Sequence, residues 1–419
     1  MVRPKHGLRS GVLGIAAAVL LLSVALPSSA QDRKNATDTT PVMSHEEALS
    51  LDAEEFAKTG TLDEEGMASR LELENEIAGS IEEIRTISGP RLSAVYVIPE
   101  ESLAIHVRLT GDGEIKRLSE FSSTLPVPVY VEYGATYSQD ELVAATNEIA
   151  EQIMLEKVEG VDGVEVSGTT ESLVFVTNSK ADSSTKKALA GITSDFFGAK
   201  SGVAARGAVA SPIEVVFEEH EGAAENTSRG GVALTSCTSG FTVVSGTVRG
   251  FLTAGHCGNT QKFATTPTGV ASQTSTFKGE NYGTTADIQW HSPTVAASFK
   301  QFFGSSATTA TTQLGTQTTY VGQGLCHRGM ASGYSCGYVT SLNFAPTWSN
   351  ACNGSGCSAV FVRASGTNLA NLGGDSGGPW FGGAYAYGIH KGGLIAEVGA
   401  WAVFTPIAKM STLGVSLYK

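Results

Sequence analysis

The sequence predicts an α+β region over residues 31–228, followed by an all-β barrel or sandwich over residues 229–419. Residues 31–228 contain 15 basic and 37 acidic residues, whereas residues 229–419 contain 10 and 4. The second part is rich in glycine, serine and threonine, and it holds short β-branched runs such as "FTVVSGTV". Many short strands with frequent turn residues are typical of barrels and sandwiches. The two parts therefore differ in both charge and fold class.

The first 30 residues have the pattern of a secretory signal peptide. Arg3, Lys5 and Arg9 precede an apolar run from Val12 to Leu26, and small residues lead up to Ala30. Such a segment directs export and is then removed. A permanent membrane anchor is the alternative, but the run is short for a full span. We expect a secreted, extracellular protein without stable membrane attachment.

Residues 45–125 are predicted to form an N-terminal lobe of helices followed by strands. From His45 to Ile87, apolar residues recur at helical spacing among many glutamates, and Thr61 followed by Glu64 predicts a capping box. Two strand-like pieces follow, "LSAVYVIPE" and "LAIHVRL", separated by turn residues.

Residues 127–217 are predicted to form a ferredoxin-like lobe. The strand "PVPVYVEY" is followed by a helix, a hairpin, a second helix and the strand "SPIEVVFEE". This β-α-β-β-α-β order is that of the split βαβ unit, and it brings no catalytic combination of residues. Residues 218–228 are charged and rich in small residues, which predicts a linker that proteases can cut.

The cysteines predict disulfides and no metal site. All six lie after residue 236, at Cys237, Cys257, Cys326, Cys336, Cys352 and Cys357. An even number in an exported domain favours three disulfides. Zinc is the alternative, but no pair has the Cys-x-x-Cys ligand spacing. No metal or organic cofactor is expected.

The charge distribution bears on the partners of the chain. Lysine and arginine residues after residue 228 are scattered singly, which argues against a nucleic-acid partner. Opposite fields favour association, so we expect the acidic region to lie on the basic domain. Two separately solvated surfaces are the alternative.

One serine in the second part is surrounded by glycines. Ser376 stands in "GGDSGGPW", and a serine becomes a nucleophile when a histidine base takes its proton and a carboxylate orients that histidine. The domain has two aspartates, and Asp375 adjoins the serine, so Asp287 is the candidate orienting residue. The candidate bases are His256, His291, His327 and His390.

The α/β-hydrolase elbow G-x-S-x-G is an alternative that also matches this serine motif. In that fold the acid and then the histidine follow the serine. After Ser376 the chain has no aspartate, and its one acid, Glu397, comes after His390. The order of the residues therefore rejects this alternative.

Three motifs carry a resemblance to a known family. "LTAGHC", "ADIQW" and "GGDSGGPW", in this order, resemble those of chymotrypsin-fold (trypsin-like) serine peptidases of the bacterial secreted streptogrisin and α-lytic protease type. The resemblance covers about residues 230–419 and implies a double β-barrel. It implies that Ser376 is the nucleophile, His256 the general base and Asp287 the orienting carboxylate. The backbone N–H groups of Gly374 and Ser376 would form the oxyanion hole.

The resemblance also implies structural partners. It suggests the disulfides Cys237–Cys257 and Cys326–Cys336, which leaves Cys352–Cys357 as a local loop. Asp375 needs a cationic partner if it is buried, and "CHRG" offers Arg328. His291 and His327 are expected to be ordinary surface or loop residues.

The segment "AYGIHKGG" corresponds in this family to the strand that lines the first substrate pocket, which places His390, Lys391 and Gly392 there. Relatives with a histidine at the position of His390 tend to cut after glutamate, and a histidine with a nearby lysine suits a carboxylate. The alternative is a satisfied strand histidine and a small apolar pocket. Lys391 replaces the small serine that usually supports the aspartate.

These observations lead to one expected function and one alternative. We expect a secreted serine endopeptidase, a zymogen whose residues 31–228 form a pro-region that acts as an intramolecular chaperone and inhibitor. Its substrates would be proteins or peptides, and the mature enzyme, residues 229–419, would be a monomer. The alternative is a non-catalytic homologue that acts as a peptide- or protein-binding module.

Overall fold

The computed structural model describes residues 40–99, 101–200, 215–220, 223–225, 232–293 and 300–419. The predicted signal peptide and residues 221–222 and 226–228 of the predicted linker lie outside these residues. Within the described residues, no helix combines the length and apolar character that crossing a bilayer requires. Residues Thr40–Lys419 form one compact unit.

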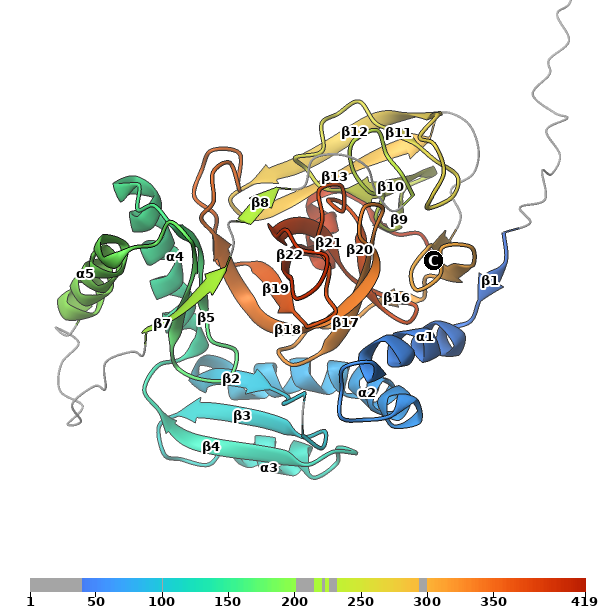
Figure 1. The fold of residues 1–419 in the computed structure, drawn as a ribbon. Coiled ribbons are helices and arrows are strands. Elements are labelled where there is room, and N and C mark those ends of the chain that lie inside the picture. Colours follow the sequence, from blue (N-terminus) through green and yellow to red (C-terminus); the bar gives the residue numbers. More distant parts are fainter. Residues whose placement is uncertain (1–39, 100, 201–214, 221–222, 226–231, 294–299) are drawn as a thin grey trace, which may run out of the picture. The chain divides into compact units, whose positions relative to one another are not determined.

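The N-terminal lobe consists of two long helices and a three-stranded sheet of order β2-β3-β4 (Figure 1). Ser44 caps the first helix in a capping box with Glu47. The second helix is capped by Asp63, which accepts a hydrogen bond from the Gly66 N–H, so the predicted capping box at Thr61 is wrong. The elements are α1 (His45–Ala57), α2 (Glu64–Ser88), η1 (Gly89–Arg91), β2 (Leu92–Tyr96), β3 (Ile105–Thr110), α3 (Lys116–Ser122) and β4 (Val129–Ala135).

The second lobe has the predicted order of elements but not the predicted ferredoxin-like sheet. Its further elements are α4 (Gln139–Glu156), β5 (Val161–Val166), β6 (Leu173–Asn178), α5 (Ser183–Lys200) and β7 (Val215–His220). Strand β4 pairs in parallel with β3, whereas β5, β6 and β7 belong to another sheet. The short β3-α3-β4 connection favours pairing between neighbours in sequence. The six elements therefore do not close on themselves, which corrects the prediction.

The free edge of β5 is covered by the C-terminal domain. Strand β5 pairs antiparallel with β18 (Gly333–Pro346), and Phe344 lies opposite Glu165. The sheet thus runs from the acidic region into the all-β domain (Figure 1). Gly163 permits this approach, because a Cβ there would lie 2.1 Å from the Phe344 ring.

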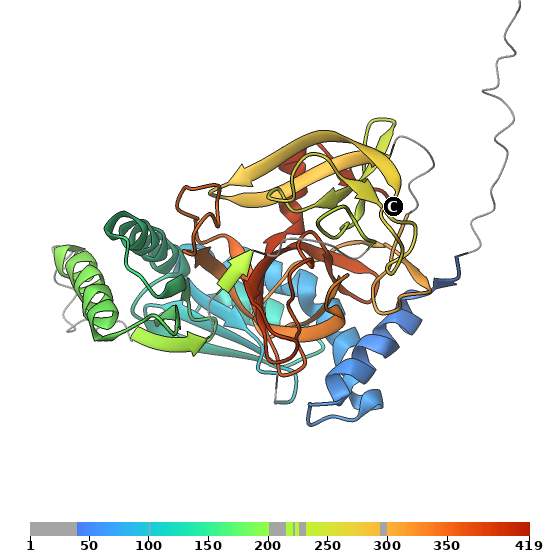
Figure 2. The same cartoon turned by 45° about the horizontal axis from the view of Figure 1, so that its top comes forward.

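The C-terminal domain is the predicted all-β barrel structure. Strands β17, β20, β21, β22, β19 and β18 pair in this order, and β17 also pairs with β18, which closes a six-stranded barrel. A separate six-stranded sheet has the order β11-β12-β13-β10-β9-β23. Figures 1 and 2 show the two from different directions.

The bounds of the barrel and sheet strands follow the turn residues in the sequence. They are β9 (Thr242–Ser245), β10 (Val248–Thr253), β11 (Lys262–Phe263), β12 (Gln273–Gly283), β13 (Ala286–Pro293), β17 (Gly324–Gly329), β19 (Phe361–Ser365), β20 (Pro379–Gly382), β21 (Tyr385–Leu394), β22 (Trp401–Pro406) and β23 (Ser416–Leu417). Short pieces complete the list: β1 (Val42–Met43), β8 (Ala223–Glu225), β14 (Gln301–Phe302), β15 (Ala310–Thr312), β16 (Gly315–Thr316) and η2 (Ile407–Leu413).

All six cysteines are joined in the pairs that the resemblance implied. The bonds are Cys237–Cys257, Cys326–Cys336 and Cys352–Cys357. The first ties the chain before β9 to the loop after β10. The second bridges the paired strands β17 and β18, and the third closes a loop of four residues between its two cysteines.

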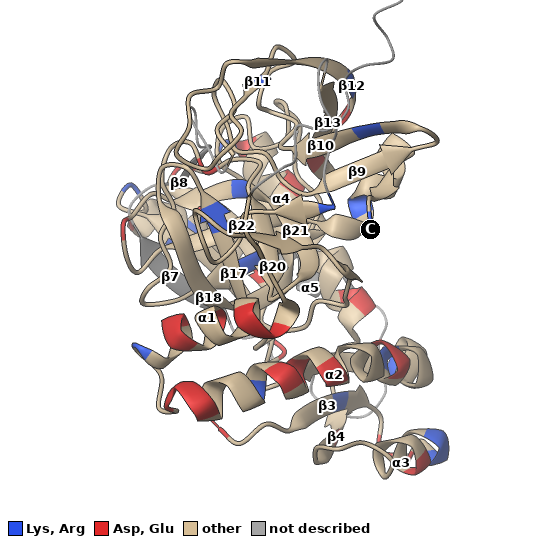
Figure 3. Ribbon diagram, turned by 90° about the vertical axis from the view of Figure 1, so that its right-hand side faces the viewer, with Lys and Arg blue, Asp and Glu red and all other residues tan. Residues whose placement is uncertain are grey.

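Buried acidic side chains connect the acidic region to the all-β domain. Figure 3 shows acidic residues along α1 and α2. Glu165 forms a buried ion pair with Arg363 at 3.0 Å. Asp52 of α1 is buried and accepts hydrogen bonds from the Gly383 N–H, the Tyr334 hydroxyl and the Ser305 hydroxyl. These contacts agree with the expected association of the two oppositely charged parts.

Asp52 is expected to make the contact between the two parts depend on pH. Burial raises the pKa of Asp52 to about 6, although its three hydrogen bonds oppose the rise. Protonated Asp52 therefore makes its full contribution to stability below about pH 4, near the pKa of aspartate in the unfolded chain. This contribution is lost as the pH rises through 6. Between pH 4 and 7, Asp52→Asn should gain about 3 kcal/mol in unfolding free energy relative to the unsubstituted chain.

Urea unfolding of the full chain carrying Ser376→Ala, which prevents the expected self-cleavage, measures this difference at the two pH values. Asp112→Asn, which changes an exposed aspartate, is the matched control and should show no such gain. An Asp52→Asn chain that follows the unsubstituted chain at both pH values would contradict the prediction.

Candidate active site

Three elements of the C-terminal domain bring the predicted triad together. His256 follows β10, and Asp287 is the second residue of β13; the six-stranded sheet contains both strands. Ser376 lies in the turn before β20 of the closed barrel. The site is thus built from both halves of the domain, although 120 positions separate His256 from Ser376.

The three side chains form a continuous chain of hydrogen bonds. His256 Nε2 lies 2.9 Å from Ser376 Oγ, and His256 Nδ1 lies 2.7 Å from Asp287 Oδ2. The other carboxylate oxygen, Oδ1, accepts the backbone N–H of His256 at 2.9 Å. Because a carboxylate only accepts, Nδ1 carries the proton and Nε2 is left as the acceptor for the serine hydroxyl. The arrangement can therefore take a proton from Ser376.

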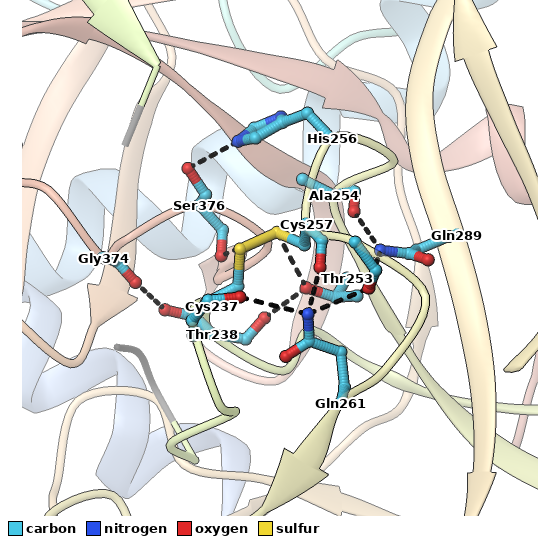
Figure 4. The surroundings of a disulfide bond; sticks show 12 residues. Cys237, Thr238, Thr253, Ala254, His256, Cys257, Gln261, Gln289, Gly374 and Ser376 are labelled. Atoms are coloured by element: carbon cyan, nitrogen blue, oxygen red, sulfur yellow. Dashed lines mark hydrogen bonds between the residues drawn. A yellow bond between two sulfur atoms is a disulfide. The ribbon is translucent and has the colours of Figure 1, made fainter. Parts of the chain in front are cut away.

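Thr238 holds the loop that carries the serine (Figure 4). Its hydroxyl donates to the carbonyl oxygen of Gly374 at 2.8 Å, and its N–H donates to that of Ser376 at 2.7 Å. The neighbouring Cys237–Cys257 disulfide links this strand to His256. Sequence reasoning missed Thr238, because only its position beside Cys237 could have indicated it.

Close contacts with neighbouring atoms require the glycines of this motif. Gly374 has φ +122° and Gly377 has φ +87°, values that side chains rarely adopt. A Cβ on Gly377 would lie 2.0 Å from Thr253 Oγ1, and one on Gly378 would lie 2.2 Å from the Arg328 carbonyl oxygen. The serine is therefore placed by residues that must lack a side chain.

Asp375 has different partners from the one predicted. Its carboxylate accepts the backbone N–H groups of Leu372, Ala331 and Ser332 at 2.7 to 3.2 Å. Among the described residues no ion pair joins it to Arg328, which donates to the Gly304 carbonyl oxygen and lies beside the Tyr334 ring. Backbone amides thus solvate the buried charge, and the predicted Arg328 partnership is wrong.

Lys391 lies beside the aspartate of the candidate triad. Its side chain is fully buried, and Nζ is 2.7 Å from Asp287 Oδ2. The side chain thus contacts Asp287, and the role of this position in a substrate pocket stays a prediction. The backbone of its neighbour Gly392 faces another strand, because it pairs with Glu225 of β8.

His390 is a buried histidine with both ring nitrogens engaged. Nδ1 accepts the Trp380 indole N–H at 3.2 Å, and Nε2 lies 2.9 Å from Asn371 Oδ1. An indole N–H only donates, so Nε2 carries the proton of the neutral ring. Burial, together with His327 and His256, lowers the pKa of His390 well below its usual value. Sequence reasoning found His390 but missed Asn371 and Trp380.

The two remaining histidines of the domain are interior residues, contrary to expectation. His291 lies in β13, and His327 lies in β17, where it stacks on Trp380 and His390. Both are fully buried. Burial lowers the pKa of His291 to about 4 and also lowers that of His327. Strands buried on both faces lack the alternation of apolar and polar residues that marks an interior position in a sequence. The sequence therefore did not show that these histidines are buried.

The described residues contain two groups of side chains with suitable spacing for a metal ion. One is Cys237, His256 and Cys257, and the other is Asp52, Cys326 and Cys336. Each group includes both sulfurs of a disulfide. A disulfide offers no thiolate, which is the form of cysteine that binds metals.

Comparisons with solved structures return bacterial proteases. Thermobifida fusca Protease A is 29% identical, with 46% of this chain and 98% of that chain covered and a TM-score of 0.38. A structure described as a glutamic acid specific serine protease that utilizes a novel histidine triad in substrate binding is 24% identical. It covers 45% of this chain and 99% of its own, with a TM-score of 0.39. No family model matches the chain.

Curated relatives give the stronger likeness. Streptogrisin-C of Streptomyces griseus is 32% identical over 173 residues, which are 41% of this chain and 35% of that protein. Glutamyl endopeptidase 2 of the same organism is 30% identical over 190 residues, 43% of this chain and 93% of that protein. The match thus spans about a third of the first relative and nearly all of the second. With the closed barrel, this likeness shows that the chain belongs to the bacterial chymotrypsin-fold serine proteases.

Proposed function

We propose that the protein is a secreted serine endopeptidase that cuts peptide bonds through Ser376, His256 and Asp287. The hydrogen-bonded chain from Ser376 Oγ to Asp287 Oδ2 is the observation that carries the proposal. His256 would take the proton as the serine oxygen attacks the peptide carbonyl, and would then give it to the leaving amine. The resulting acyl-enzyme would be hydrolysed by water activated by the same histidine.

The backbone N–H groups of Gly374 and Ser376 would stabilise the oxyanion of each tetrahedral intermediate. The two bonds from Thr238 to this loop support the role, because an oxyanion hole depends on donors that are held in place before the reaction. The positive φ of Gly374 further supports a backbone shaped by that requirement.

We also propose that residues 31–228 are a pro-region that inhibits the protease and assists its folding. Strand β8 pairs antiparallel with β21, and Glu225 lies opposite Gly392, next to Lys391. The segment before the predicted cleavage site therefore lies along the strand assigned to substrate, which supports inhibition. The shared pairing of β5 with β18 supports a role in folding, since it offers a template for one barrel strand.

The primary specificity proposed is for glutamate. Glutamyl endopeptidase 2, to which the chain is similar, supports this choice. The state of His390 favours the second candidate, a small apolar side chain, because this neutral histidine already bonds to Asn371 and Trp380. The cleavage site in the chain itself can distinguish the two.

Replacing the nucleophile tests the proposed function. Ser376→Ala should lower the hydrolysis of labelled casein by about 10⁴-fold or more, and it should leave the secreted chain uncut. The wild type should lose its pro-region and yield a fragment of about 20 kDa from the 43.4 kDa chain. Intact mass and N-terminal sequencing measure both. Ser411→Ala, at an exposed serine in η2, is the matched control and should behave as the wild type.

Each outcome has a distinct meaning. A new N-terminus at Asn226 would support glutamate specificity, whereas one after Thr227 or Ser228 would favour the small apolar pocket. Identical cutting of wild type and Ser376→Ala would mean that another protease processes the chain. A folded, processed wild type without hydrolytic activity would instead support the peptide-binding alternative.

A further inference from the structure

A lysine ammonium is enclosed directly behind the triad. Lys391 Nζ lies 2.7 Å from Asp287 Oδ2 and also donates to the carbonyl oxygen of Ala351. The side chains of Lys391 and Asp287 are both completely buried. An unpaired buried ammonium would be costly, so these oxygens satisfy a charge that the surroundings could not otherwise hold.

Three aromatic rings complete the enclosure. Nζ lies 5.5 Å from the ring centroid of Phe361, 5.7 Å from that of Tyr282 and 5.9 Å from that of Trp348. All three distances fall within the range of cation–π attraction. We call Tyr282, Trp348 and Phe361 the aromatic cage.

The cage and the carbonyl are tied to one small loop. Ala351 precedes Cys352, whose bond to Cys357 closes the loop. The Tyr282 hydroxyl donates to the carbonyl oxygen of Asn350 at 2.7 Å, which fastens the loop to β12. The ammonium is therefore held by contacts from several separate elements, and its position is specified.

One carboxylate oxygen of Asp287 accepts hydrogen bonds from two donors. Oδ2 accepts hydrogen bonds from both His256 Nδ1–H and the Lys391 ammonium, each at 2.7 Å. The atoms Nδ1 and Nζ are therefore at most twice that distance apart. Burial raises the pKa of the Asp287 carboxyl, but His256 and Lys391 together outweigh it and hold the pKa below its usual value. The neighbouring positive charge thus favours the carboxylate form of Asp287.

The titratable groups that face His256 are few among the described residues. Asp287 comes from β13 and Tyr282, whose ring centroid is 6.1 Å away, comes from β12. Lys391 and His390 come from β21, and His390 is neutral. Asp287 and Lys391 are therefore the two charged groups that decide the protonation of His256.

We propose that Lys391 is a positioning residue of the triad, whose ammonium fixes Asp287 and keeps His256 unprotonated, and so competent as a base, in mildly acidic solution. This inference rests on the proposed peptidase function. A carboxylate beside a histidine favours the imidazolium, and a neighbouring ammonium opposes it. At this separation and an effective dielectric constant of about 20, the opposing effect is about two pH units.

The first measurement is the pH profile of kcat/KM for labelled casein between pH 4 and 9. The acidic midpoint of the processed wild type reports the titration of His256 and is the reference for the variants. Lys391→Met and Lys391→Gln remove the charge and should raise the midpoint by about two units. Lys391→Arg keeps the charge and should keep the midpoint. Lys278→Met, at an exposed lysine of β12, is the control for net charge and should change nothing.

A purely structural role for Lys391 predicts a different result. The neutral variants would then lose activity equally at every pH, with no shift of the midpoint, and this would overturn the proposal. A Lys391→Arg variant whose midpoint rises by about two units above that of the wild type would overturn it as well, because the charge is kept there. That second criterion uses a variant that keeps the buried cation, so the proposal stays testable if the neutral variants fail to fold.

A second measurement separates this inference from the proposed function. In the Ser376→Ala chain labelled with ¹⁵N-histidine, the ring resonance that disappears in a His256→Gln variant reports the titration of His256. The same rise of the midpoint in Lys391→Met is expected there without any hydrolysis. If the wild type hydrolyses nothing but this titration behaves as expected, the function fails and the role of Lys391 stands. An unchanged midpoint in Lys391→Met of an active enzyme gives the reverse conclusion.

Discussion

Asp287→Asn is expected to lower kcat by about 10⁴-fold at neutral pH and also to destabilise the folded chain by about 3–5 kcal/mol. The loss of rate follows because an amide cannot hold His256 in the tautomer whose Nε2 accepts the serine proton. The loss of stability follows because the buried Lys391 ammonium is left without its counter-ion. Casein hydrolysis measures the first effect, and urea unfolding of the Ser376→Ala chain measures the second.

A double variant separates the two effects of Asp287→Asn. Adding Lys391→Met removes the uncompensated charge, so most of the lost unfolding free energy should return. The rate should stay low, because the histidine still lacks its carboxylate. If Asp287→Asn alone were as stable as the parent chain, the ammonium would not depend on Asp287, which would contradict this account of the buried pair.

Glu165→Ala is expected to destabilise the unprocessed chain by about 3–5 kcal/mol, because it leaves the buried Arg363 guanidinium without its carboxylate. Glu165 and Arg363 belong to strands on either side of the contact between the acidic region and the C-terminal domain. The loss should therefore appear mainly as weaker docking of the acidic region. Urea unfolding of the Ser376→Ala chain measures the free energy, and hydrogen exchange of β5 and β18 locates the loss.

The chain offers a matched control for this ion pair. Glu132 pairs with Arg108 within the pro-region at 2.9 Å, but the Glu132 side chain is 55% exposed. Exposed pairs contribute little, so Glu132→Ala should cost no more than about 1 kcal/mol. Equal losses from the two alanine variants would show that the burial of the Glu165 pair has no special weight.

The triad could be predicted from the sequence because its signals are local. "LTAGHC" and "GGDSGGPW" each place a reactive side chain within a short motif, and the scarcity of aspartate after residue 228 left Asp287 as the partner. The all-β class followed from composition and short strands in the same way. The disulfide pairs came from the resemblance to a family, and the structure has the same pairs.

Strand pairing in the pro-region was beyond the reach of the sequence pattern. The order of elements from β4 to β7 was predicted, but the pattern does not say which edge each strand joins. Strand β4 pairs with β3, and the edge of β5 is occupied by β18, which lies more than 160 residues later. Backbone hydrogen bonds are alike for every strand, so long-range packing decides among the partners.

By itself, the sequence determined which residues could carry the chemistry and what kind of domain would hold them, because reactive types at fixed local spacing need no knowledge of distant contacts. Only the tertiary structure decided where long side chains reach. Arg328 donates a hydrogen bond to a carbonyl oxygen, and backbone amides donate to Asp375 in its place. Lys391 lies in the aromatic cage and donates to Asp287. A buried charge lies wherever distant strands supply oxygens and rings to satisfy it, and that supply exists only in the folded chain.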